Sequence, residues 1–469
     1  SPSEDRLSLF VERIYNIEGF SPIIWVGKSL IENYIPTSID PKDPSKLDIG
    51  PVNTTVTTNP VDGVRLRASL QTTANLNPHM FWRGYLAYGF RDQRWKGLGE
   101  VTYSFRRKAY LPMEFPVSNL TFTYSYDVSV PSDQYLTTDK DNVFMAFKWA
   151  DVKHMTYDRS FKLVYDQEWD YGLQWRAQLR HDMTEPTYKL FYQPVVNGIH
   201  YDAQGNYNPR PFGPGDGTSF SARNRRYLRT TDFSVLLQYQ PGVAYINTKQ
   251  RRILVNKEAP IYRISHMAGL RGVWSDYTYN LTEVGVRKRV WLRSWGRMDF
   301  DFAAGAQWNR VPFPLLIMPR ANLAYVYDDD MYYLVDNMEF LNDRYAQLMF
   351  NWSMNGKIFN RIPLFNRLKW REHVGFNILW GRLTDKNNPY LEKNKTRSDL
   401  YYFPGEFNPD GSFRQQSKVM DPQVPYVEAA FGIHNIFKLF HIDYVRRFTY
   451  LDDPRTTRWG IRFMARVIF

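Results

Sequence analysis

Long runs in which apolar and polar residues alternate constrain the fold of this chain more than any other feature of its sequence. Between residues 119 and 130, every second residue from Leu120 to Val130 is apolar, and the residues between them are polar. Residues 64–71, 171–180, 297–308 and, with two exceptions, 370–381 follow the same pattern. Because successive side chains of a β-strand point to opposite faces, each run predicts a strand with one apolar and one polar face.

The length of these runs favours a membrane protein over a soluble β-sandwich, whose strands would also alternate. Most runs cover about 10–14 residues, whereas soluble strands typically have about 5–6. A tilted strand needs about 9–11 residues to cross a bilayer. Aromatic residues such as Trp82, Phe90, Trp370 and Trp380 lie near the ends of the apolar faces, where such rings meet lipid headgroups.

Composition excludes several other classes of protein. No stretch approaches 18 apolar residues, the length that a membrane-spanning helix requires. The chain has no cysteine, so disulfides, thiolate metal sites and a cysteine nucleophile are excluded. The net charge is +12, but no Lys/Arg run accompanies a nucleic-acid-binding motif, and we predict no nucleic-acid partner.

We therefore predict an all-β fold, a transmembrane antiparallel up-and-down β-barrel of about 16 strands with long extracellular loops. The barrel is expected to occupy residues 61–469, with long loops at 195–226, 310–341 and 383–423. The candidate strands are 61–74, 79–91, 97–107, 117–130, 142–152, 157–168, 171–183, 187–194, 227–240, 259–271, 276–290, 297–309, 343–355, 367–382, 424–435, 438–449 and 457–468. Since bacterial barrels usually have an even number of strands, one candidate is in excess, and 187–194 is the shortest.

Residues 1–60 differ from the rest and are predicted to form a periplasmic lead-in with short helices. Leu7, Phe10, Val11 and Ile14 recur at helical spacing. Residues 1–5 have neither the basic nor the apolar region of a signal peptide, so we expect mature protein or a piece of a longer one.

The predicted polar faces are rich in arginine. If the barrel interior is open, they should favour anions; if it is closed, they should form an ion-pair network with acids such as Asp127, Asp299 and Asp301. Residues 1–60 are the only plug that we identify, and they look too short for this barrel. The interior basic residues predicted are Arg65, Arg67, Arg176, Arg180, Arg263, Arg271, Arg297, Arg371, Arg462 and Arg466.

The sequence shows no motif for catalysis. It contains no G-x-S-x-G, H-E-x-x-H, P-loop or dinucleotide fingerprint. His434 and His441 flank a predicted turn and can approach each other, and His373 is expected to join an interior polar network. The run Asp328–Asp330 lacks the spacing of a calcium loop. We therefore predict no catalytic residue, no cofactor and no metal site.

The last predicted strand ends in an alternating apolar face with a terminal aromatic. A soluble edge strand this apolar would invite aggregation. The face resembles the C-terminal strand by which the assembly machinery recognises outer-membrane barrels. Its residues are Trp459, Ile461, Phe463, Ala465, Val467 and Phe469.

Several further segments, in order, carry a family resemblance. They are 61–67, 84–89, 311–316, 359–365, 368–372 and 435–440. They resemble Gram-negative outer-membrane proteins that carry a carboxypeptidase-regulatory-like domain, over about residues 30–469. In that family a non-catalytic periplasmic β-sandwich, which this sequence does not contain, precedes a barrel half of unknown function.

A looser resemblance is to the barrel-assembly and two-partner-secretion superfamily, whose barrels have 16 strands. The inner loop of those barrels carries an Arg-Gly motif that docks on acidic residues of the wall. Leu270-Arg271-Gly272 is the nearest candidate here, although it lies on a predicted strand.

These resemblances imply a non-enzymatic protein of the Gram-negative outer membrane. We expect a scaffold or accessory subunit in outer-membrane protein assembly, biogenesis or a surface complex; the alternative is a channel or transporter for anionic solutes. The expected partners are outer-membrane lipids and lipopolysaccharide, the barrel assembly machinery and other outer-membrane or surface proteins.

Overall fold

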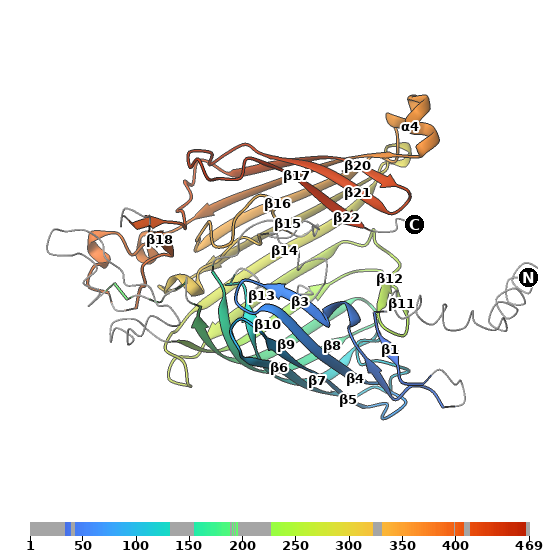
Figure 1. Ribbon diagram of the computed structural model, residues 1–469, viewed down its shortest axis with the longest axis horizontal. Coiled ribbons are helices and arrows are strands. Elements are labelled where there is room, and N and C mark those ends of the chain that lie inside the picture. Colours follow the sequence, from blue (N-terminus) through green and yellow to red (C-terminus); the bar gives the residue numbers. More distant parts are fainter. Residues whose placement is uncertain are drawn as a thin grey trace, which may run out of the picture.

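A single antiparallel sheet dominates the structure, which is a computed structural model (Figure 1). The structure describes residues 33–38, 43–131, 154–187, 190, 192, 194–195, 227–321, 331–397, 399–407 and 413–465. Within these residues the sheet has 18 strands, and β11 (Tyr245–Asn247) with β12 (Arg252–Leu254) and β18 (Gly405–Phe407) with β19 (Phe413–Gln415) form two separate hairpins. The predicted all-β, up-and-down architecture is confirmed.

Fifteen strands of the described sheet are long, and each of them except the last pairs with the next long strand along the chain. They are β4 (Gly63–Thr72), β5 (Met80–Gly89), β6 (Trp95–Ser104), β7 (Ser118–Ser129), β8 (Thr156–Glu168), β9 (Leu173–Pro186), β10 (Leu228–Tyr239), β13 (Ile261–Gly269), β14 (Asn280–Trp291), β15 (Arg297–Gln307), β16 (Arg344–Ser353), β17 (Arg371–Arg382), β20 (Tyr426–Ile436), β21 (Phe440–Arg447) and β22 (Trp459–Ala465).

Three short strands complete the sheet at its N-terminal edge. β3 (Val56–Asn59) pairs with the first half of β4, and β2 (Leu47–Ile49) pairs with the last residues of β4. The 3-10 turn η1 (Val52–Thr54) separates them, and β1 (Ile35–Pro36) pairs with β2. β2 and β3 thus share one position in the sheet as a broken strand, next to the fifteen long ones.

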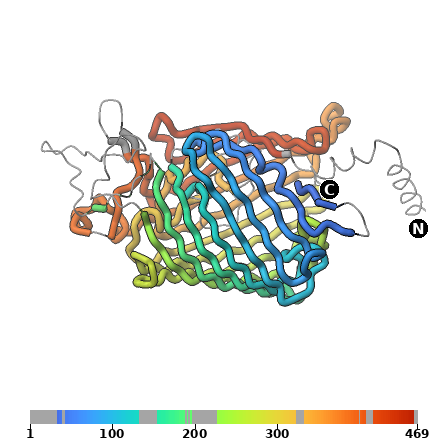
Figure 2. The backbone as a smooth tube through the Cα atoms, turned by 60° about the horizontal axis from the view of Figure 1, so that its bottom comes forward, coloured from blue at the N-terminus to red at the C-terminus, as the bar shows by residue number. Residues whose placement is uncertain are grey.

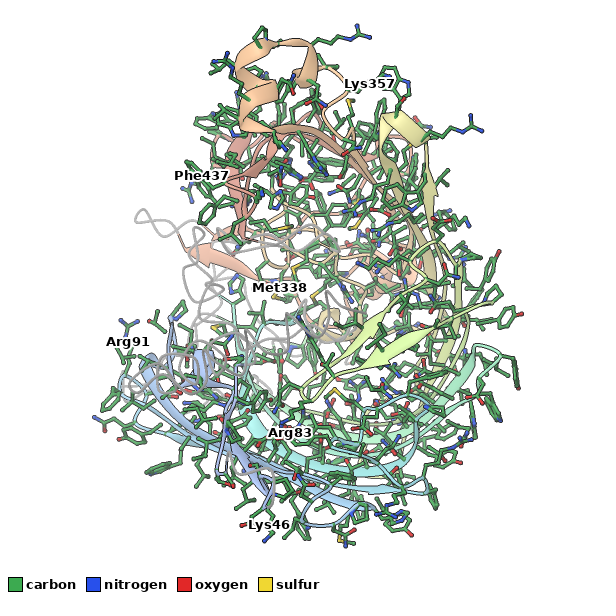
Figure 3. All side chains as sticks on the ribbon, turned by 90° about the vertical axis from the view of Figure 1, so that its right-hand side faces the viewer. Lys46, Arg83, Arg91, Met338, Lys357 and Phe437 are labelled. Carbon is green, nitrogen blue, oxygen red and sulfur yellow. The ribbon has the colours of Figure 1, made fainter. Side chains whose placement is uncertain are left out.

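The ring of strands is not closed. Among the described residues, β22 pairs only with β21, and the outer edge of β4 carries only β2 and β3. Viewed from one end, the sheet curves around an interior (Figure 3). We call the unpaired region between β22 and the β2/β3 edge the seam.

Fifteen of the seventeen candidate strands coincide with these long strands. The candidate strand 187–194 is not seen among the described residues. Those of its residues that the structure describes form only isolated bridges, such as that of Pro194 with Tyr401. Candidate 142–152 lies outside the described residues, and β7 pairs directly with β8. The strand predicted from residue 367 begins later, at Arg371, because Pro363–Leu368 form helix α4.

The helices of the described residues are all short. They are α4, η1, η3 (Arg293–Trp295), η4 (Phe313–Leu315), η5 (Phe359–Arg361), η6 (Asp385–Asn387) and η7 (Glu392–Asn394). None of the helices in the described part of the chain has the length and apolar character needed to span a membrane.

The two faces of the strands have opposite chemistry. On β7, Leu120, Phe122 and Tyr124 are exposed on the outer face, whereas Ser125 and Asp127 line an interior cavity. This division follows directly from the alternating sequence.

The connections between strands differ at the two ends of the sheet (Figure 2). Because the strands alternate in direction, the connections 130–155, 187–227, 308–343 and 383–425 join strand ends at one end, which we call the long-loop end. The turns 169–172, 292–296 and 437–439 join strands at the opposite end, where two longer connections, 240–260 and 354–370, also lie. Long extracellular loops and short periplasmic turns are the rule for outer-membrane barrels.

One long connection folds into the interior. We call residues 311–321 and 331–341 the interior segment. Val311, Phe313 and Leu316 are at most 1% exposed, as are Phe340 and Leu341, and they lie in the two largest apolar clusters of the described residues. The expectation that only residues 1–60 could act as a plug is therefore wrong. The apolar sequence of 311–318 explains why this connection leaves water.

Candidate functional site

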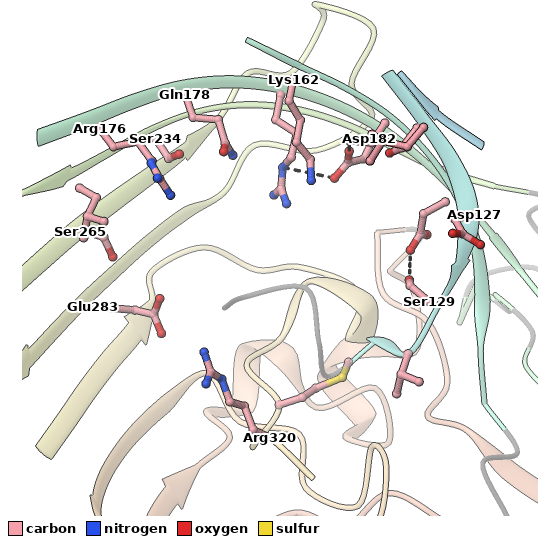
Figure 4. Close-up of a pocket in the computed structure, with 18 of the residues that line it drawn as sticks. Asp127, Ser129, Lys162, Arg176, Gln178, Asp182, Ser234, Ser265, Glu283 and Arg320 are labelled. Carbon is pink, nitrogen blue, oxygen red and sulfur yellow. Dashed lines mark hydrogen bonds and ion pairs between the residues drawn. The ribbon is translucent and has the colours of Figure 1, made fainter. Parts of the chain in front are cut away.

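A cavity of about 1560 Å³ lies between the inner faces of the strands from β4 to β16 and the interior segment (Figure 4). The alternating sequence turns the polar side chains of these strands inward, and the apolar interior segment closes the opposite wall. The residues labelled in the close-up are Asp127, Ser129, Lys162, Arg176, Gln178, Asp182, Ser234, Ser265, Glu283 and Arg320.

Five of the predicted arginines line this cavity, namely Arg65, Arg67, Arg176, Arg180 and Arg263. Arg65 donates two hydrogen bonds to Asp127, at 2.6 and 2.8 Å. The guanidinium of Arg67 lies 3.7 Å from the centre of the Tyr85 ring, a cation–π contact.

The remaining three of these five arginines also face carboxylates. Arg176 Nε lies 2.6 Å from Asp166, Arg180 lies 2.9 Å from Asp232, and Arg263 lies 3.6 Å from Asp301. This arrangement is the ion-pair network that we predicted for a closed interior. The network surrounds a cavity, however, and does not fill the barrel. Such pairs hold the wall charges in fixed positions and reduce the net positive field in the cavity.

Arg297, Arg371 and Arg462 do not line the cavity. Arg297 Nε lies 3.7 Å from Asp299. Arg371 is half-buried at the first residue of β17, at the end of the sheet opposite the long-loop end. Arg462 is fully buried beneath the interior segment, where it donates a hydrogen bond to the carbonyl of Tyr333.

The prediction that Arg271 faces the interior is wrong, because it lies exposed in the turn between β13 and β14. Leu270-Arg271-Gly272 therefore does not reach the interior. Instead, Arg320 of the interior segment points across the cavity toward Glu283 of β14 (Figure 4), and Tyr345 donates a 2.7 Å hydrogen bond to the same carboxylate. No Arg-Gly pair marks this position, so the motif search missed it.

The C-terminal strand alternates as predicted. Trp459, Ile461 and Phe463 are exposed on one face of β22, while Arg462 is buried on the other. Ala465 is the last residue of the strand. Arg466, Val467 and Phe469 lie outside the described residues, as do Asp328–Asp330.

Two buried carboxylates that sequence reasoning missed fasten the interior segment to the last strands. Glu339 of the segment forms two hydrogen bonds with Arg447 of β21, at 2.7 and 3.0 Å. Glu428 of β20 accepts hydrogen bonds from the backbone N–H groups of Tyr333 and Leu334, at 2.8 and 3.0 Å. Alternation places Glu428 and Arg447 on the inner face, but it cannot show that their partners come from a loop.

None of the curated proteins matches this chain. Among solved structures, BamA from Haemophilus ducreyi lacking POTRA domains 1–3 aligns with a TM-score of 0.45 and 12% identity, over 87% of this chain and 68% of that one. CdiB from Escherichia coli aligns with a TM-score of 0.44 and 9% identity, over 87% of this chain and 60% of that one. OprB from Pseudomonas putida aligns with a TM-score of 0.33 and 8% identity, over 84% of this chain and 85% of that one. Likenesses this weak carry no argument about function.

The C-terminal domain of a family of unknown function, DUF5686, matches residues 36–394. The match includes β2 to β17, all but two of the residues that line the cavity, and the interior segment, and it covers more than half of the chain. The chain therefore belongs to the DUF5686 family.

Proposed function

We propose that this chain is an integral barrel of a Gram-negative outer membrane that serves as a non-enzymatic scaffold or accessory subunit, in outer-membrane protein assembly or in a surface complex. The outer face supports the membrane setting. Trp82, Leu86 and Trp95 are 51, 64 and 66% exposed, and so dense an apolar surface requires lipid or a partner to cover it.

The seam is the observation that carries the proposal. Within the described residues, β22 has a partner on one side only, and the opposite edge consists of the short, broken pair β2 and β3. An unpaired edge presents backbone N–H and C=O groups that pair readily with a strand of another chain. We propose that the seam engages such a strand from a partner protein.

The filled interior favours this role over transport. The interior segment packs beneath β16–β22, where Glu339 and Glu428 fasten it, so that part of the barrel offers no wide passage. The cavity is the specific feature in favour of the alternative, a channel for anionic solutes, because arginines such as Arg67 and Arg176 line it. An anion-selective conductance in planar bilayers that Arg67→Ala weakens would move the proposal to transport.

Photo-crosslinking tests the seam directly. A crosslinking amino acid at Ile461, on the outer face of β22, should capture other outer-membrane proteins in cells, identified by mass spectrometry. Tyr262 is the matched control: it is 47% exposed, against 45% for Ile461, but its strand β13 is paired on both sides. Equal capture at the two positions, or none at Ile461, would contradict the seam role.

The proposal also includes partners that the family resemblance implies. These are outer-membrane lipids and lipopolysaccharide, the barrel assembly machinery at the C-terminal strand, and other outer-membrane or surface proteins. The proposal assigns no catalysed reaction to the chain, and turnover of esterase or protease substrates by the purified protein would contradict that part.

A further inference from the structure

Three histidines and one aspartate meet on the inner face of β17, β20 and β21, near the end opposite the long loops. His373 comes from β17, His434 from β20, and His441 and Asp443 from β21. Their exposed fractions are 4, 6, 1 and 2%. The strands' outer-face neighbours, such as Phe431, are exposed, so the four side chains share the protein interior.

The three side chains of His373, His434 and Asp443 converge at one point. His373 Nδ1 lies 2.8 Å from Asp443 Oδ1, and His434 Nε2 lies 3.1 and 3.2 Å from the two oxygens of the same carboxylate. One nitrogen or oxygen atom from each of the three residues lies within 4.8 Å of the others. The two imidazole rings stack at 4.2 Å.

Gly432 makes this convergence possible. In the sheet register, His373 pairs with Gly432, and Gly432 pairs with Asp443. The aspartate must therefore reach across β20 to contact His373. A Cβ atom on residue 432 would collide with Asp443 Oδ1, so only glycine at this position lets the carboxylate occupy its place.

The geometry suits a metal ion. Zn²⁺ binds His nitrogen and Asp oxygen at about 2.0–2.2 Å in tetrahedral sites, which puts neighbouring ligand atoms roughly 3.3 Å apart. The His434–Asp443 separations of 3.1 and 3.2 Å are close to this spacing. We propose that His373, His434 and Asp443 bind a divalent transition-metal ion, for which Zn²⁺ is the best fit.

The ligand types select this class of ion. Imidazole nitrogen suits zinc, copper and nickel, whereas Ca²⁺ takes 6–8 oxygen ligands, and the cluster offers one carboxylate. His441 packs edge-on against His434, with ring centres 4.4 Å apart, so the approach that their position beside a predicted turn allowed does occur.

Two arginines lie in register with the cluster. Arg371 is in register with His434, and Arg462 is in register with Asp443, but the Arg462 guanidinium is directed to the carbonyl of Tyr333. A bound ion would join β17, β20 and β21 and so fix the strands that support β22. This role does not depend on the proposed function of the seam.

Metal binding to the whole chain in detergent tests the proposal. The protein is stripped with EDTA, dialysed and titrated with Zn²⁺, and in parallel with Co²⁺, whose visible absorption reports tetrahedral coordination. The chain has no cysteine, so thiolate binding cannot contribute to the signal. We expect about one Zn²⁺ per chain and a tetrahedral Co²⁺ spectrum.

Three variants and one control identify the ligands. His434→Gln and Asp443→Asn remove a ligand, and we expect affinity at least about tenfold weaker. Gly432→Ala keeps all ligands but displaces Asp443, and should weaken binding similarly. His266→Gln is the control: it lies exposed on β13, with Nδ1 2.9 Å from Thr282, and should bind as the unaltered chain does.

Folding is checked independently by the faster migration of an unboiled barrel on an SDS gel. A variant that fails this check is set aside, and the decision then rests on the unaltered chain and the remaining variants. The proposal is overturned if the unaltered chain binds no Zn²⁺ in excess of His434→Gln, or if His266→Gln loses binding to the same extent. Either result would make the cluster a purely hydrogen-bonded one.

Discussion

The half of the interior that holds the cavity and the half that the interior segment fills, beneath β16–β22, are built from the same sequence pattern, but one ion pair in each half shows how different the environments of such pairs can be. In the cavity half, the side chains of Arg176 and Asp166 retain 35 and 15% exposure. In the filled half, those of Arg447 and Glu339 retain 0 and 5%. The difference comes from the connection between β15 and β16, which folds inward under the last strands and leaves the first ones open to the cavity.

The comparison shows how burial changes the consequence of losing one charge. An ion pair that keeps contact with water contributes little, because water already stabilises each partner. A pair removed from water contributes modestly while intact, but loss of one member leaves a buried charge without compensation. The Arg176–Asp166 and Arg447–Glu339 pairs should therefore respond very differently to the loss of one member.

The largest effect is expected from Glu339→Ala, in the filled half. Removal of the carboxylate leaves the buried guanidinium of Arg447 without its acidic partner, which should lower the free energy of unfolding by about 3–5 kcal/mol. Denaturant titration in detergent, followed by tryptophan fluorescence, measures the change. A loss below about 1 kcal/mol, the size of a surface pair, would mean that water reaches this pair.

A smaller loss is expected from Leu316→Ala, which opens a void in the interior segment. Leu316 is 0% exposed, so the change should cost about 3 kcal/mol. Leu86→Ala is the matched control, because Leu86 is 64% exposed on the outer face. If both substitutions cost the same in the titration, the interior segment does not form a packed core.

Arg176→Ala tests the cavity half. Its pair with Asp166 keeps contact with water, so we expect a loss of no more than about 1 kcal/mol. The same variant should change the ion selectivity of any conductance in planar bilayers toward cations, because it removes one positive charge from the cavity wall. A loss as large as that of Glu339→Ala would erase the contrast between the halves.

The smallest effect is expected outside both halves. Asp385, at the long-loop end, is exposed, and a 2.7 Å hydrogen bond from Lys393 Nζ lowers the pKa of its carboxyl group. A carboxyl group whose pKa is lower in the folded state than in the unfolded state stabilises the fold at any pH above its unfolded-state pKa. This stabilisation is lost as the pH falls through the folded-state pKa. For so exposed a pair, Asp385→Asn should leave the unfolding midpoint unchanged at pH 7. A measurable shift would show that the loop packs more tightly than its exposure indicates.

Local sequence predicted the strands well, and its failures have physical causes. The pattern from Leu120 to Val130 defines a strand because period two is a property of the extended backbone itself. The exception at 367–370 arises where Pro363, favourable in the first turn of a helix, starts α4 before the strand. Arg271 was misplaced because alternation cannot show where a strand stops and a turn begins.

The site was less accessible to sequence reasoning. The cavity arginines follow from alternation, and Arg65 and Arg180 lie where it places them. The acidic partners of these arginines lie far from them in the chain, as Asp232 does from Arg180. The same is true of Glu339 and Arg447. The histidine cluster has no local ligand spacing, because its members come from three neighbouring strands.

The sequence by itself thus determined which residues form strands and which face of each is polar, since both depend on neighbours one or two positions away. Only the tertiary structure decided which loop enters the interior, which charges lose their water and which histidines meet. Those outcomes depend on the register between strands and on the volume left inside the sheet, and neither is encoded in any short stretch of the chain.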